Sequence, residues 1–258
     1  MLELSSSRWN DLMHAYGPAT DTPQLLRRIH AGPSQEDWSD LCGSLTHQGG
    51  VSQAAYAAVP HVVAACAAAS PKDRLDYLAF VACVIIGYDH KPIPSDLRHD
   101  YDQSLERARP LAQGMLAESH GYSSTIYVMQ AWAALSGRIA LARIIEGLAD
   151  AEFPLECPHC ERGLYVWPRP NGFTAHAEDP VHAPHDSTWR LAPRKLNEPV
   201  AAATHATGSD LACLASQLGP AHRERIRGEL EYLNADCPCP HCSKSFHLYA
   251  QLVQEADA

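Results

Sequence analysis

Two short motifs carry the clearest chemistry in this 258-residue sequence. Each reads Cys-Pro-His-Cys, once at residues 157–160 and once at residues 239–242. A Cys-x-x-Cys turn directs two thiolates at one metal ion, and two such turns complete a tetrahedral zinc site. We therefore predict one Zn²⁺ bound by all four cysteines of the two motifs: Cys157, Cys160, Cys239 and Cys242. Because four protein thiolates fill the coordination sphere, the expected zinc is structural and not catalytic.

The two motifs belong to a longer internal duplication. Equivalent positions of the two copies are separated by the same number of residues along the sequence as Cys157 and Cys239. We call this separation the duplication offset. Gly137 and Gly219 each split a pair of helical segments, and each lies 20 residues before the first cysteine of its motif. The remaining matches fall on both sides of the motifs: Arg143-Ile144 with Arg225-Ile226, Leu148 with Leu230, and Leu164, Val166 and Trp167 with Phe246, Leu248 and Tyr249. The predicted repeated unit is a helix pair, a zinc knuckle and a strand.

Two features leave alternatives open at the zinc site. Cys237 precedes the second motif and could replace a ligand, but the duplication offset places it on Leu155, an apolar position, so we favour a packing role. A redox dithiol is the other interpretation of each Cys-x-x-Cys motif. The histidines within the motifs, His159 and His241, are expected to point away from a metal held by the cysteines.

Helical signals dominate the residues that precede the first motif. An alanine-rich segment at 51–69 and an apolar segment at 73–88 predict buried helices, and short helices follow at 123–135 and 138–149. Successive short helices separated by Gly or Pro turns favour a mainly α protein, either a HEAT-like α-solenoid or a helical bundle.

The character of the sequence changes at Phe153, where prolines interrupt the helical period. We predict a helical-repeat domain at 1–150 and a zinc-ribbon region at 151–258. A helical hairpin at about 207–234 interrupts the ribbon.

A second cluster of chemically active side chains lies at residues 176–186, which hold His176, His182, His185 and Asp186. Histidine and aspartate could bind a second metal or transfer protons. Prolines and the lack of helical spacing instead favour an extended surface loop, where His182 and His185 could contact a partner. In the helical part, the candidate binding residues are Trp38, His47, Gln48 and Tyr56.

Composition narrows the class of partner and the compartment. Asp and Glu outnumber Lys and Arg by 30 to 20, so the formal charge of −10 argues against nucleic acid and favours a basic protein. The longest apolar run, residues 78–88, is shorter than the roughly 20 residues that span a bilayer, and no secretory signal is visible. We expect a cytoplasmic protein without membrane contact, whose nine cysteines favour metal binding over disulfides.

The amino-terminal motifs Trp38-Ser-Asp-Leu41, His47-Gln-Gly49 and Tyr56-Ala-Ala-Val-Pro60, together with the helix–CPxC–strand units, resemble a group of uncharacterised bacterial HEAT-like proteins. Helical-repeat proteins of this kind resemble adaptors and, in some cases, immunity proteins that neutralise bacterial toxins. The resemblance implies a protein-binding module and supplies no catalytic residues.

The sequence lacks a Walker loop and the GxGxxG, GxSxG and HExxH motifs, so no catalytic signature favours an enzyme. The leading expectation is an immunity or adaptor protein that covers a basic partner, such as a toxin, with an acidic helical surface. The alternatives are a nucleic-acid-binding zinc ribbon that uses nearby basic residues, and a hydrolase that uses the loop at 176–186. The basic residues for the first alternative are Arg162, Arg169, Arg190, Arg194 and Lys195.

Overall fold

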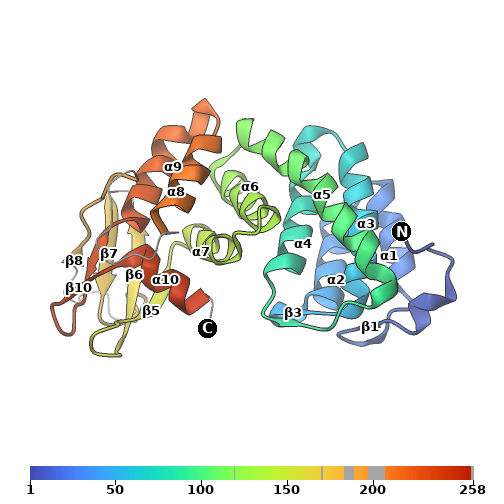
Figure 1. The fold of residues 1–258 in the computed structure, drawn as a ribbon, viewed down its shortest axis with the longest axis horizontal. Coiled ribbons are helices and arrows are strands. Elements are labelled where there is room, and N and C mark those ends of the chain that lie inside the picture. The colour runs from blue at the N-terminus through green and yellow to red at the C-terminus, as the bar shows by residue number, and fades with distance from the viewer. Residues whose placement is uncertain (119, 170, 183–188, 197–206, 257–258) are drawn as a thin grey trace. The chain divides into compact units, whose positions relative to one another are not determined.

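The computed structural model describes residues 1–118, 120–169, 171–182, 189–196 and 207–256. In this part of the chain it contains ten α-helices and several small sheets, and the protein is 59% helical (Figure 1). The prediction of a mainly α protein is therefore confirmed, whereas the HEAT-like solenoid stays a prediction. None of the described helices is both long and apolar enough to cross a bilayer.

The chain forms two compact units. Unit 1 comprises Met1–Met115 and Ala134–Gly137, and unit 2 comprises Leu116–Ala133 and Arg138–Ala258. The helix pair before the first cysteine motif lies mostly in unit 2, which matches its place in the duplicated part of the sequence.

Unit 1 is built around one central helix. Its helices are α1 (Thr22–Ala31), α2 (Gln35–Leu45), α3 (Gln53–Ala68), α4 (Leu75–Ile86) and most of α5 (Ser95–Ala117). The alanine-rich α3 is buried on most of its surface and packs against α1 and α4 (Figure 1). Its small side chains let the neighbouring helices approach, and Ser52 caps it by accepting the N–H of Ala55.

Short strands and 3-10 turns connect these helices. They are η1 (Ser7–Asn10), β1 (Met13–His14), β2 (Gly17–Pro18), η2 (His47–Gly49), β3 (Gly50–Val51), η3 (Pro71–Asp73) and β4 (Asp89–His90). Strand β3 pairs in parallel with β4, with Gly50 opposite Asp89 and Val51 opposite His90. The hydroxyl of Tyr56 donates to the carbonyl oxygen of Lys91 at 3.0 Å, which fixes the chain just beyond β4.

Unit 2 combines helices with two antiparallel sheets. Its helices are α6 (Tyr122–Leu135), α7 (Ile139–Asp150), α8 (Thr207–Gln217), α9 (Pro220–Leu233) and α10 (Leu248–Ala256), although the end of α6 is grouped with unit 1. Its strands are β5 (Phe153–Glu156), β6 (Gly163–Arg169), β7 (Gly172–His176), β8 (Trp189–Arg190), β9 (Asp236–Pro238) and β10 (Ser245–His247). Strands β5-β6-β7-β8 form one sheet in that order, and β9 and β10 form the other.

The duplication detected in the sequence is present in the strand pairing. In the first copy Glu156 lies opposite Gly163 and Leu155 opposite Leu164. The equivalent residues of the second copy pair in the same register, because Pro238 lies opposite Ser245 and Cys237 opposite Phe246. Helices also correspond, since α6 and α8 end at Leu135 and Gln217, which are again separated by the duplication offset.

The two copies diverge after their second strand, and here the sequence-based expectation was wrong. We expected Leu248 and Tyr249 to continue a strand, as Val166 and Trp167 do in the first copy. Instead β10 ends at His247 and the helix α10 begins at Leu248. The imidazole Nδ1 of His247 accepts the N–H of Ala250, so this side chain caps the new helix.

Candidate functional site

The four cysteines of the two motifs form one cluster in unit 2. The Sγ atoms of Cys157, Cys160, Cys239 and Cys242 all lie within 4.8 Å of one another. Two pairs span the copies: Cys157 Sγ lies 3.9 Å from Cys242 Sγ, and Cys160 Sγ lies 3.8 Å from Cys239 Sγ. Zn–S bonds of about 2.3 Å in a tetrahedron place sulfurs about 3.8 Å apart, so the cluster has the dimensions of a four-thiolate metal site.

Each motif folds into the same turn. The N–H of Cys157 donates to the carbonyl of Arg162, and the N–H of Cys239 donates to the carbonyl of Lys244, both at 3.0 Å. The residue after each motif, Glu161 or Ser243, has a positive φ of 56° or 60°. Both turns therefore adopt a conformation that non-glycine residues seldom take, and it recurs at the same position of the two copies.

The histidines within the motifs join one turn to the other. The Nε2 atom of His159 lies 3.1 Å from the carbonyl oxygen of Ser245, and the Nε2 atom of His241 lies 2.9 Å from that of Gly163. Each ring must donate from Nε2, because a carbonyl only accepts. The prediction that these side chains point away from a metal did not foresee this pair of reciprocal hydrogen bonds.

Burial and hydrogen bonds shift the pKa values of the Cys157 and Cys239 thiols in the cluster, and a cation would stabilise their thiolate forms. Burial raises the pKa of the Cys239 thiol to about 12. Burial also acts to raise the pKa of Cys157, but hydrogen bonds from the backbone N–H groups of His159 and Cys160 outweigh it, and the net shift is downward. Cys239 is therefore a neutral thiol at neutral pH unless a cation is bound, and a divalent ion at the centre of the cluster would displace the thiol protons and stabilise the thiolates.

Cys237 is not a member of the cluster. Its side chain is fully buried in β9, and burial raises the pKa of its thiol to about 12. It occupies the position that Leu155 holds in the first copy, opposite Phe246. It therefore packs in the core of the second copy as an apolar residue would.

The histidine segment at 176–186 is only partly described. His176 is not in a surface loop as expected: it is buried in β7, where its Nε2 lies 2.9 Å from Thr174 Oγ1. His176 lies on the same face of β7 as Thr174, opposite to the buried Phe173 and Ala175, so its burial departs from the alternation of the strand. The side chain of His182 is 83% exposed and lies 3.9 Å from Asp179, whereas His185 and Asp186 lie outside the described residues.

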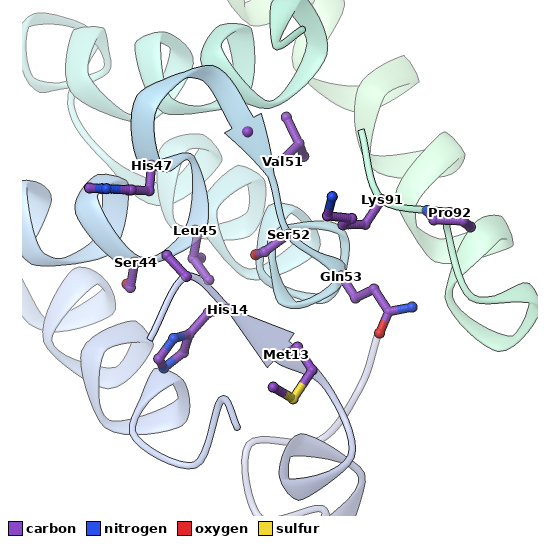
Figure 2. Close-up of a pocket in the computed structure, with 12 residues that line it drawn as sticks. Met13, His14, Ser44, Leu45, His47, Val51, Ser52, Gln53, Lys91 and Pro92 are labelled. Atoms are coloured by element: carbon purple, nitrogen blue, oxygen red, sulfur yellow. The ribbon is translucent and has the colours of Figure 1, made fainter. Parts of the chain in front are cut away.

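Unit 1 contains a cavity of about 530 Å³ that opens to the surface (Figure 2). Its lining comes from β1, the end of α2, β3, the start of α3 and the segment after β4: Met13, His14, Ala15, Ser44, Leu45, His47, Gly50, Val51, Ser52, Gln53, Lys91 and Pro92. Figure 2 shows Lys91 and Gln53 toward one end of the view, His47 at the other end and Ser52 between them. The imidazole of His14 is fixed, because its Nδ1 accepts the N–H of Tyr16 and its Nε2 lies 3.0 Å from Asp21.

The four binding residues suggested for the helical part lie in different places. His47 lines this cavity, and Gln48, with a φ of 49°, follows it in η2. Tyr56 is buried, and its hydroxyl donates to the carbonyl oxygen of Lys91. Trp38 packs in the core, with its ring 4.9 Å from that of Tyr77, and borders a separate pocket.

Sequence reasoning missed most of the cavity lining. Met13, Gln53 and Lys91 come from segments that are far apart in the chain, and no local motif links them. The reciprocal histidine bonds had a usable signal, because Gly163 and Ser245 are related by the same duplication offset as the cysteines.

Comparisons of the chain with protein-family models, curated proteins and solved structures gave no match.

Proposed function

We propose that the protein is a binding module for a basic protein partner and that a structural zinc ion stabilises unit 2. The observation that carries the first part is a group of exposed hydrophobic side chains at the cavity of unit 1. Met13 lines the cavity and is 48% exposed. Tyr16, whose ring lies 5.6 Å from that of His47, is 71% exposed, and Tyr88, which packs on Gly49, is 73% exposed. Exposed apolar side chains grouped in this way mark interaction sites.

The charge of unit 1 supports a basic partner. Its residues include 13 carboxylate side chains and 9 Lys or Arg side chains. Several of the cations are already engaged, as in the pairs Arg8–Asp96 at 3.0 Å and Arg109–Glu106 at 3.1 Å. The surplus is therefore negative, and it would attract a basic surface and accelerate its association. The resemblance to immunity proteins makes a bacterial toxin one candidate for that partner.

The choice of zinc follows from the ligands. Four thiolates at tetrahedral spacing select Zn²⁺ or an iron–sulfur centre, and paired Cys-x-x-Cys turns of this kind are typical of structural zinc. Because the cysteines occupy all four positions, the metal would join the two copies and leave no open site for catalysis.

The two alternative functions have less support. Of the basic residues near the cysteines, Arg194 is paired with Asp236, and Arg169 lies over the ring of Trp167 at 4.3 Å. Engaged cations are less available to phosphates. For a hydrolase, no cluster of three or more His, Cys, Asp or Glu side chains suited to a metal occurs in the described residues apart from the four cysteines.

The test is capture of a partner from nuclease-treated lysate of the source organism, read by mass spectrometry. The wild-type chain is compared with the double variant Tyr16→Ser/Tyr88→Ser and with Tyr127→Ser, which removes a tyrosine that is 40% exposed in unit 2. We expect a basic protein that wild type and Y127S retain and the double variant loses. Its retention should fall steeply with added salt. Equal retention by all three proteins, or capture of nucleic acid alone from untreated lysate, would refute the proposal.

A further inference from the structure

Three polar side chains of the unit 1 cavity, Ser52, Gln53 and Lys91, have hydrogen-bond donors left for a ligand. Ser52 accepts the N–H of Ala55, which leaves its hydroxyl proton for a ligand. Lys91 uses one of its three ammonium protons on Asp89 at 2.8 Å. No described residue hydrogen-bonds the side-chain amide of Gln53. All three side chains line the cavity, and no Asp or Glu is among the lining residues.

The cavity also has apolar lining residues. They include Met13, Leu45, Val51 and Pro92. A ligand that satisfies both parts carries an acceptor, preferably an anion, next to an apolar group. A carboxylate held by Lys91, Ser52 and Gln53 would make charge-assisted hydrogen bonds, which are stronger than neutral ones.

We propose that this cavity binds the carboxyl-terminal residue of the partner chain, with its apolar side chain on the apolar wall and its α-carboxylate on Ser52, Gln53 and Lys91. The inference rests on the proposed function, since it names which part of a protein partner enters the site. Capture of a chain end by converging donors is an established mode of peptide recognition.

The surroundings of the cavity favour a chain end over a free organic acid. A small acid that fills the cavity leaves Met13, Tyr16 and Tyr88 exposed, whereas a polypeptide continues outward and covers them. Carboxylates next to the lining residues, Asp21 at His14 and Asp89 at Lys91, are 61% and 71% exposed. In this proposal, basic residues upstream of the partner's terminus contact these two carboxylates. The terminal carboxylate itself contacts Ser52, Gln53 and Lys91.

The experiment uses the full-length protein, immobilised, and a pooled library of acetylated hexapeptides. Lysine and arginine occupy the second and fourth positions, and all residues are allowed elsewhere. The pool is made once with a free α-carboxylate and once as the α-carboxamide, and mass spectrometry identifies the retained peptides. Lys91→Gln removes the cation, and Lys72→Gln is the matched control, because Lys72 is an exposed lysine of unit 1 outside the cavity.

We expect retained sequences to end in an apolar residue and to bind about tenfold more tightly as acids than as amides. K91Q should reduce this ratio toward one, and K72Q should leave it unchanged. Equal retention of acids and amides, or equal behaviour of K91Q and K72Q, would overturn the inference. So would N-acetyl-leucine that binds as tightly as the best peptide, because the cavity would then be a site for free acids.

Different results refute the proposed function and the proposed carboxylate site. Retention of a lysate partner by K91Q at the wild-type level refutes only the carboxylate contact. Absence of any partner that depends on Tyr16 and Tyr88 refutes only the proposed function, because the peptide library measures the cavity directly.

Discussion

His159 and His241 make the same hydrogen bond in opposite directions across the cysteine cluster. His159 donates to the carbonyl of Ser245, and His241 donates to the carbonyl of Gly163. Both donors and both acceptors are related by the duplication offset. The two copies therefore contact each other through these two hydrogen bonds as well as through the cysteine cluster.

The reciprocal bonds predict a role for both histidines in metal affinity. His159→Ala and His241→Ala should each weaken zinc binding by about 0.5–1.5 kcal/mol, the usual net value of one hydrogen bond, because the turns lose part of their preorganisation. Competition with a chelator of known affinity measures the change. His182→Ala is the matched control, since that side chain is 83% exposed and outside the cluster. Equal affinity of all three variants would contradict the assignment.

The backbone of Ala117 lies so close to Gly219 that we expect any side chain at this position to destabilise the protein. A Cβ atom at this position would lie 2.5 Å from the carbonyl oxygen of Ala117, and the Gly219 N–H donates to the carbonyl of Leu116 at 2.8 Å. We expect Gly219→Ala to lower the free energy of unfolding by about 1–3 kcal/mol. Gly114→Ala, within α5 and with open space at its Cβ, should instead be neutral or raise it by up to about 1 kcal/mol. Urea denaturation measures both, and an unchanged midpoint for G219A would rule out the clash.

Two buried histidines predict a loss of stability in mild acid. Burial lowers the pKa of His61 and of His247 below the ordinary 6.5. The unfolded chain therefore takes up these protons more readily, and their contribution to stability is complete above pH 6.5 and is lost as the pH falls below it. His247→Asn keeps an acceptor for the N–H of Ala250 and removes the titration. With zinc in excess, the variant should lose less stability than wild type between pH 7.5 and 5.5, and an equal loss would exclude His247.

Removal of the metal should affect unit 2 far more than unit 1. All four cysteines lie in unit 2 and are separated by up to 85 residues in the chain. Structural zinc sites of this type bind with about 10–16 kcal/mol of apparent free energy, which is as large as the stability of a typical domain. A chelator should abolish protection of the β5–β6 and β9–β10 amides from hydrogen exchange and leave α3 protected. Unchanged exchange in unit 2 would contradict a structural role for the metal.

The cysteine cluster was predictable because its information is local and repeated. The spacing within each motif defines a turn, and the constant offset indicated that the second turn pairs with the first. The same offset identified Cys237 as the equivalent of Leu155, which agrees with its burial in β9. Most helices were predictable for a similar reason, because their apolar periodicity and their Gly or Pro boundaries lie within one segment.

Other features depend on contacts that no local pattern encodes. Leu248 and Tyr249 are β-prone, yet a cap from His247 and packing of α10 against α7 favour a helix. The cavity of unit 1 exists because β3 pairs with β4 although α3 and α4 lie between them in the sequence, which brings Lys91 beside Ser52 and Gln53. Tyr56 and Trp38 were candidate binding residues, for which a core or groove position was the favoured interpretation, and both are buried.

The zinc content of three purified proteins tests the central claim most directly. Metal analysis of wild type, Cys239→Ser and Cys237→Val separates a cluster ligand from its buried neighbour. We predict about one zinc per chain for wild type and C237V, and a loss of the bound metal for C239S. A wild-type protein that binds no zinc, or a C237V protein that loses the metal while C239S retains it, would contradict a site formed by Cys157, Cys160, Cys239 and Cys242.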